Sequence, residues 1–314
     1  MYDVIGDIHG HADALKALLR RMGYTVSRGS WRYPGNSRKA IFLGDYIDRG
    51  PDSPGVIGIV RAMVEAGDAI ALMGNHEYNA VLWHTVDAAG APLRSHNVAH
   101  RKQHQATLDA YHREAPGLTR GTSPSLREAI RWFRSLPLYY EDDSIRAVHA
   151  VWDDQSIAVL RGNPRALMDE SFLLRSADPA TREHEAIETL LKGIEIPIPG
   201  GRSFLDKEGT RRARTRIRWW ESPPIDPVPF PRIALPPADT ELADLLVSSG
   251  ELPVIGYTDD RPVFFGHYWL TGPPRLQGER VACVDYSIAL GGRLCAYRYD
   301  GDLPLREDRF VCVP

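Results

Sequence analysis

Short apolar runs alternate with amphipathic stretches over the first eighty residues. The apolar runs, typical of buried strands, occupy residues 2–6 (YDVIG), 39–44 (KAIFLG) and 69–74 (AIALMG). Two stretches between them, residues 12–23 and 53–67, have the pattern and end signals of helices, and each closes at a glycine. This strand–helix alternation predicts right-handed crossovers and a mostly parallel start to a sheet.

The rest of the chain is less regular. Residues 79–135 read as a helical insertion, and apolar β-like runs return near 137–152 and over 262–300. Seven prolines between residues 222 and 237 predict an irregular connector. We expect an α/β protein whose residues 1–314 form one domain carrying that insertion and that connector.

Composition excludes few functions. The chain is 43% apolar and 25% charged, as in ordinary globular proteins, and its net charge of -3 gives no general case for binding nucleic acid or anionic membranes. No apolar run approaches the roughly 20 residues of a membrane helix. The opening residues already read as a strand rather than a signal peptide, so a cytoplasmic location is expected. Cys283, Cys295 and Cys312 match neither a zinc spacing nor a disulfide framework, which predicts buried thiols in a reducing compartment.

Polar clusters follow each of the first three predicted strands. The clusters are GDIHG with Asp7 and His9, GDYIDRG with Asp45, Asp48 and Arg49, and GNHE with Asn75 and His76. In an open α/β sheet the carboxyl ends of the strands form the ligand-binding edge, so the clusters are expected to meet there. Residues two apart in an extended segment point the same way, which lets Asp7 and His9 reach one metal ion.

Two later β-like runs each contain a histidine, His149 in VHA and His267 in GHY. A histidine inside an apolar run is more often a hydrogen-bonded core residue than a ligand. The three polar clusters at the strand ends favour the ligand interpretation here.

These five motifs, in this order, resemble those of the calcineurin-like metallophosphoesterase superfamily. The similarity is strongest to its PPP-type branch of serine/threonine phosphatases and diadenosine-tetraphosphatase-like bacterial enzymes. The resemblance implies a four-layer α/β/β/α sandwich of two mixed sheets. It also implies that one metal is held by Asp7, His9 and Asp45, and a second by Asp45, Asn75, His149 and His267.

The implied cofactors are two divalent ions, with Mn first and Fe, Zn, Mg or Ni as alternatives, because the ligands are oxygen and imidazole without thiolate. Such a pair can generate a bridging hydroxide for in-line attack on a phosphate ester. His76 is the candidate general acid, and Asp48 would orient it. Arg49 can donate two hydrogen bonds to phosphate oxygens.

The expected function is therefore dinuclear-metal phosphoester hydrolysis, on a nucleotide-type or other small phosphate substrate. A serine/threonine protein phosphatase acting on a phosphoprotein is the alternative, and a non-catalytic metal-binding scaffold is the alternative from another class. Nucleic acid as a partner is left open and no membrane partner is expected. Trp269, two residues after His267, resembles the PPP-type pattern, which lacks a histidine there. The ending CVDYSIALGGRLCAYRYD resembles that of the bacterial nucleotide-polyphosphatase-like relatives.

Several weaker features remain. His96, His100 and His104 recur every four residues, and a solvated helix face is preferred over a metal or pH-sensing face. The arginine run at 211–218 is interpreted equally as a phosphate- or base-binding groove and as a structural ion-pair network. Glu77 is expected to be structural, and Trp269 to lie in the core.

Overall fold

The computed structural model describes residues 1–114, 122–205, 211–221, 226–235, 242, 244–248, 250, 252 and 256–314. The chain divides into two compact units. Unit 1 comprises residues 1–192 and 261–314, and unit 2 comprises residues 193–260. Every candidate site residue belongs to unit 1. The expectation of one domain over 1–314 stays a prediction.

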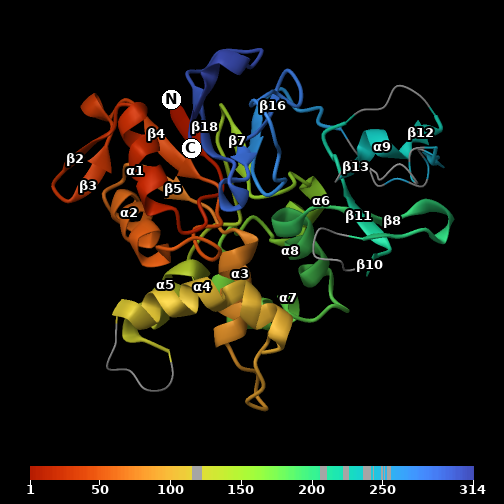
Figure 1. Cartoon of the computed structure of the whole chain (residues 1–314), viewed down its shortest axis with the longest axis horizontal. Coiled ribbons are helices and arrows are strands. Elements are labelled where there is room, and N and C mark those ends of the chain that lie inside the picture. Colours follow the sequence, from red (N-terminus) through yellow and green to blue (C-terminus); the bar gives the residue numbers. More distant parts are fainter. Residues whose placement is uncertain are drawn as a thin grey trace. The chain divides into compact units, whose positions relative to one another are not determined.

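A mixed six-stranded sheet carries the amino terminus of unit 1 (Figure 1). Its strands are β17 (Asp285–Tyr286), β18 (Arg293–Tyr299), β1 (Tyr2–Ile5), β4 (Lys39–Phe42) and β5 (Ala69–Ala71) in that order, with β19 (Phe310–Val313) also paired to β18. The β1–β4 and β4–β5 pairs are parallel, as the sequence pattern predicted. The β1–β18 pair is antiparallel, so the end of the chain returns beside its beginning.

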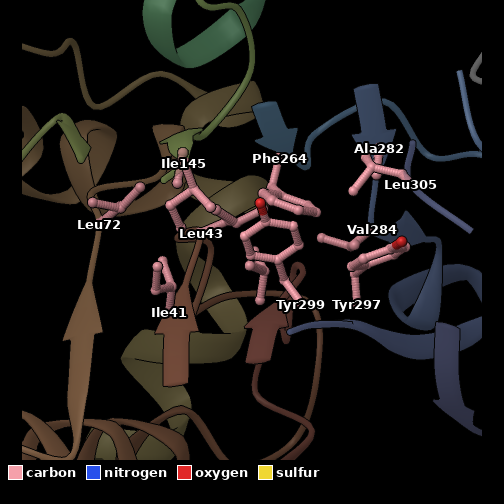
Figure 2. Packing of buried hydrophobic residues seen from close by; sticks show 12 residues of the cluster. Ile41, Leu43, Leu72, Ile145, Phe264, Ala282, Val284, Tyr297, Tyr299 and Leu305 are labelled. Carbon is pink, nitrogen blue, oxygen red and sulfur yellow. The ribbon is translucent and has the colours of Figure 1, made fainter. Parts of the chain in front are cut away.

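A second mixed sheet has four strands, β16 (Val281–Cys283), β15 (Val263–Phe265), β7 (Arg146–Val148) and β6 (Tyr139–Glu141). Its apolar side chains share one buried cluster with those of the first sheet. Figure 2 shows Ile41 of β4 and Leu43, which follows β4, in one group with Ile145, which precedes β7, and Phe264 of β15. The two mixed sheets are thus joined by a common core, in line with the predicted fold class, while the four-layer arrangement stays a prediction.

Helices surround these sheets. They are α1 (Ala12–Arg21), α2 (Ser53–Glu65), α3 (Asn75–His84), α4 (Val98–Glu114), α5 (Pro124–Arg134), α6 (Asp154–Val159), α7 (Glu170–Ser176) and α8 (Arg182–Lys192). A short hairpin joins β2 (Thr25–Ser27) to β3 (Ser30–Arg32). The first two helices follow β1 and β4, as predicted. Within the segment 79–135, the described residues form the end of α3, then α4 and α5, with a non-helical stretch at 85–97, and in Figure 1 α3, α4 and α5 lie together.

Unit 2 consists of short elements around its own apolar cluster. They are β8 (Glu195–Pro197), β9 (Phe204–Leu205), β10 (Arg211–Arg212), β11 (Arg214–Ile217), β12 (Val228–Pro229), α9 (Phe230–Ile233), β13 (Ala234–Leu235) and β14 (Leu246–Val247). The described part of the 222–237 connector therefore contains regular structure. It has two two-residue strands and a single helical turn, which the prediction of an irregular connector did not include.

Four of the five arginines at 211–218 lie on β10 and β11, and Arg218 directly follows β11. Arg214 Nη2 donates to the Glu195 carbonyl at 2.6 Å, and Arg218 Nη1 donates to the Arg232 carbonyl at 3.2 Å. Both guanidinium groups thus bind backbone of the same unit. These contacts favour the structural interpretation of the run over the binding groove.

The cysteine prediction was wrong for two of the three residues. Cys295 and Cys312 are directly opposite in the antiparallel β18–β19 pair and form a disulfide, while Cys283 is a buried thiol. Residues opposite each other on adjacent strands have Cβ atoms close enough to bridge. A separation of 17 residues gave no sign of this pairing, because the pairing depends on the register of β19.

Among the described residues, no helix combines the length and apolarity needed to span a bilayer.

Candidate metal centre and active site

The end of β1 presents Asp7 and His9 to the site, and both are buried. The Asp7 carboxylate accepts a hydrogen bond from the His267 backbone N–H at 3.1 Å. His9 has a left-handed backbone, with φ +47°, and its Nδ1 lies 3.0 Å from the Ile47 carbonyl. That contact places the proton on Nδ1 and leaves Nε2 as the free lone pair, 3.6 Å from Asp45.

The loop after β4 adopts an unusual backbone. Asp45, Asp48 and Arg49 all have positive φ, at +54°, +67° and +68°, a region that side chains other than glycine rarely occupy. Such conformations cluster at functional sites, where the surrounding structure must enforce them. The charged turn is therefore held in a specific shape and is not a solvated surface loop.

Glu77 enforces part of that shape. Its carboxylate accepts hydrogen bonds from the backbone N–H groups of Asp45 and Tyr46, both at 2.8 Å. It also accepts from Ile47 at 3.3 Å and from Gly74 at 3.1 Å. The buried side chain thus ties the start of α3 to the loop after β4. The expected structural role of Glu77 fits these contacts.

The first turn of α3 supplies Asn75 and His76. The His76 backbone N–H donates to Asp45 Oδ1 at 3.0 Å, and its ring Nδ1 lies 2.7 Å from Asp48 Oδ2. Burial lowers the pKa of His76, but the Asp45 and Asp48 carboxylates outweigh that effect and raise it. Because Asp48 pairs with Nδ1 of His76, Nε2 is the ring nitrogen that remains available to donate a proton.

His149 and His267 reach the same place from the second sheet. His149 Nδ1 lies 2.8 Å from the Leu43 carbonyl, and its Nε2 lies 3.1 Å from Asn75 Oδ1 and 3.5 Å from Asp45 Oδ1. His149 and His267 stack edge to face, with ring centroids 5.0 Å apart. His149, His267 and Asn75, all predicted from the sequence as metal ligands, therefore converge on Asp45.

Two groups of side chains within the described residues have the spacing of metal ligands. One contains His9, Asp45 and His76, and the other contains Asp45, His149 and His267. Within each group the candidate ligand atoms lie within 4.8 Å of one another, and Asp45 belongs to both. The prediction placed Asp7 in the first group and Asn75 in the second. Asp7 accepts a hydrogen bond from the backbone of His267, and Asn75 Oδ1 lies 3.1 Å from His149 Nε2. The first group also contains His76.

The residues fit divalent cations in two respects. The first is the orientation of His9 and His149, whose Nδ1 atoms face backbone carbonyls so that Nε2 points toward Asp45, the arrangement typical of metal-binding imidazoles. The second is buried negative charge. Burial and the neighbouring carboxylates of Asp285 and Asp45 raise the pKa of Asp7 well above its usual range. Cations would relieve that repulsion.

Asp285 is a buried residue that the sequence motifs did not single out. Its carboxylate accepts hydrogen bonds from the backbone N–H groups of Trp269 at 2.7 Å and Ser287 at 3.0 Å. Burial raises its own pKa. Asp285 thus anchors the loop that follows His267. The only sequence signal was its place in the CVDYS stretch.

Arg49 and Trp269 form the exposed part of the site. The Arg49 guanidinium lies over the Trp269 indole at 5.1 Å from the ring centroid. Trp269 is 42% exposed, so its assignment to the core was wrong. Its backbone is left-handed, with φ +47°. An aromatic face therefore lies beside the predicted phosphate clamp.

The three histidines that recur every four residues, His96, His100 and His104, do not form one solvated face. His96 precedes α4 and stacks on Trp83, with ring centroids 3.8 Å apart. His104 is buried, and its Nδ1 lies 2.9 Å from Asp48 Oδ1. The preference for a solvated face was therefore wrong for His104, which contacts the candidate catalytic aspartate. The four-residue spacing could not show which face of α4 is buried.

Comparison with known proteins defines the class. Residues 2–154 match the sequence model of the calcineurin-like phosphoesterases. Among curated proteins, a bis(5'-nucleosyl)-tetraphosphatase PrpE [asymmetrical] of Oceanobacillus iheyensis is 42% identical to this chain over 74 residues. These residues are 24% of this chain and 29% of that protein. The protein of the same name from Halalkalibacterium halodurans is 44% identical over 75 residues, which are 24% of this chain and 30% of that protein. The match thus spans less than a third of these relatives.

A solved structure supports the fold over a longer stretch. A protein serine/threonine phosphatase from Saccharomyces cerevisiae superposes with a TM-score of 0.50 at 14% identity, covering 99% of this chain and 78% of that one. At this identity the likeness concerns the fold alone.

Proposed function

We propose that the protein is a dinuclear-metal phosphoesterase that acts on a nucleotide-type or other small phosphate ester. The observation that carries the proposal is the sharing of Asp45 by two buried ligand groups. A carboxylate has two oxygens and can serve two cations at once, which an isolated structural ion would not require. The family match of residues 2–154 supports the same reaction class.

In this proposal His9 and Asp45, with Asp7 beside them, hold one cation, and Asp45, Asn75, His149 and His267 hold the other. When bound, two divalent cations activate water and neutralise phosphoryl oxygens. Manganese is our first choice, because the donor set is oxygen and imidazole.

The protein's own groups do the rest. His76 keeps its ring oriented through Asp48 and gives a proton to the leaving oxygen. Its raised pKa suits a group that must carry that proton near neutral pH. Arg49 binds the phosphate oxygens, and its stacking on Trp269 limits the conformations of its long side chain.

The substrate class rests on two supports. The curated relatives are bis(5'-nucleosyl)-tetraphosphatases, although the chain covers less than a third of their length. The exposed indole of Trp269 beside Arg49 also offers a surface on which a nucleobase can stack. The expected cytoplasmic location stays a prediction, and the Cys295–Cys312 disulfide counts against it, since such bonds are uncommon in reducing compartments.

The test is a substrate panel with added Mn²⁺, comparing a dinucleoside polyphosphate, a mononucleotide, a phosphodiester, p-nitrophenyl phosphate and a phosphopeptide. We expect the dinucleoside polyphosphate or the mononucleotide to have the highest kcat/KM, and Asp45→Asn to lose hydrolysis of all of them. Preference for the phosphopeptide would favour the protein-phosphatase alternative. A wild-type protein inert toward the whole panel with Mn²⁺, Fe²⁺, Zn²⁺, Mg²⁺ and Ni²⁺ would refute the proposal.

A further inference from the structure

The two carboxylate oxygens of Asp48 have separate partners. Oδ2 faces His76 Nδ1 at 2.7 Å. Oδ1 faces His104 Nδ1 at 2.9 Å and accepts a hydrogen bond from the Thr107 hydroxyl at 2.6 Å. Both His104 and Thr107 come from α4, within the predicted helical insertion, and both are buried. Asp48 is thus clamped between α3 on one side and α4 on the other.

Thr107 also fixes the backbone of Asp48. The Asp48 N–H donates to Thr107 Oγ1 at 2.9 Å, while the Thr107 hydroxyl donates to the Asp48 carboxylate. Ser53 Oγ, at the start of α2, lies 3.1 Å from the same threonine oxygen. This pair of bonds supports Asp48 at its left-handed φ of +67°.

His104 has an orienting partner of its own. Its Nε2 lies 3.2 Å from Nε2 of His84, at the end of α3. Burial lowers the pKa of His84, and the nearby His104 and His96 lower it further, to about 4. His84 is therefore neutral near pH 7. His104 Nδ1 faces Asp48, and its Nε2 is left to pair with Nε2 of His84. This contact holds the ring of His104 in the orientation that presents Nδ1 to Asp48.

We propose that His104 is a positioning residue for phosphoester hydrolysis, which together with Thr107 holds the Asp48 carboxylate in the orientation that serves His76. The inference rests on the proposed function, because His76 donates a proton only if the protein hydrolyses phosphoesters as proposed. With His76 alone, the carboxylate could rotate and exchange its oxygens. Two donors on Oδ1 prevent that rotation and leave Oδ2 directed at His76.

A core-packing role makes a different prediction from a positioning role. An apolar side chain would fill the volume of His104 but would leave Oδ1 with only the threonine. Loss of packing would reduce the amount of folded protein and lower hydrolysis of every substrate alike. Loss of positioning would affect only substrates whose leaving group needs a proton.

The experiment compares His104→Ala, His104→Asn and Thr107→Val with wild type and with His112→Ala, a control at an exposed histidine of the same helix. The asparagine amide can occupy the place of His Nδ1 and donate to Asp48. Each Mn²⁺-loaded protein is assayed for kcat and KM on phenyl phosphate, a poor leaving group, and on dinitrophenyl phosphate, a good one. Thermal unfolding and Mn content are measured on the same samples.

We expect His104→Ala to lower kcat for phenyl phosphate by about tenfold or more, with KM and the dinitrophenyl reaction changed by less than about threefold. Thr107→Val should change in the same direction, and His104→Asn should recover most of the loss. Equal losses on both esters, or none, in His104→Ala and Thr107→Val would overturn the inference while leaving the proposed function standing. A wild-type protein that hydrolyses neither ester nor any substrate of the panel would instead refute the proposed function, and this inference with it.

Discussion

Replacing Glu77 by glutamine tests whether the loop carrying Asp45 is held by a buried carboxylate. The substitution keeps the size of the side chain and one of its two oxygens. In the wild type, Oε1 accepts from Tyr46 and Ile47, and Oε2 accepts from Asp45 and Gly74. In the variant, whichever position the amide nitrogen takes, it faces two backbone N–H donors that cannot pair with it.

The magnitude follows from those two donors. A buried donor left unpaired costs roughly 1–3 kcal/mol, so two cost roughly 2–6 kcal/mol, with relaxation of the loop favouring the lower end. Glutamine also removes the buried charge and its repulsion with Asp45, which offsets part of this loss, so we expect Glu77→Gln to lower the free energy of unfolding by about 1–2 kcal/mol. The matched control is Glu185→Gln, at an exposed glutamate of α8, which should change it by less than about 0.5 kcal/mol.

The assay is urea unfolding in EDTA, so that loss of metal does not contribute, at pH 8.5. Burial, followed by the nearby Asp45 carboxylate, raises the pKa of Glu77 to about 7, and pH 8.5 keeps the side chain ionised. A Glu77→Gln variant as stable as wild type, with the same dependence on urea, would show that the four N–H groups do not require a carboxylate. The Glu77 carboxylate would then not be what holds the loop in its left-handed shape.

Three further perturbations test other parts of the site. His76→Ala should lower turnover of poor-leaving-group esters by about a hundredfold while Mn content stays near that of wild type, and loss of Mn would show that His76 is a ligand rather than the acid. Trp269→Ala should raise KM for a dinucleoside polyphosphate about tenfold but leave KM for phenyl phosphate unchanged, because a stacked base contributes about 1–3 kcal/mol; equal effects on both would exclude stacking. Cys312→Ser should lower the free energy of unfolding by about 3 kcal/mol for a loop of this length, and an unchanged urea midpoint would argue against the disulfide.

The strand ends of the first eighty residues were predictable because their signals are local. An apolar run followed by Gly-Asp or Gly-Asn places its polar residues at the carboxyl end of a strand, whatever the rest of the chain does. The parallel pairing of β1, β4 and β5 then brings Asp7, Asp45 and Asn75 to one edge. His149 and His267 lie far away in sequence, where their place in apolar β-like runs singled them out and the motif resemblance assigned them to one metal.

Features that depend on long-range packing were not predictable. A four-residue histidine spacing marks a helical face, but only the placement of α4 against Asp48 shows that His104 faces inward while His112 is exposed. The pairing of Cys295 with Cys312 depends on the register of β19 against β18. The sequence around Trp269 indicates neither its exposure nor its left-handed backbone.

The most direct test is anomalous diffraction from crystals of the wild-type protein grown with Mn²⁺. We predict two anomalous peaks on either side of the Asp45 carboxylate, one bounded by His9 and the other by His149 and His267. A single peak, or peaks away from Asp45, would contradict the account.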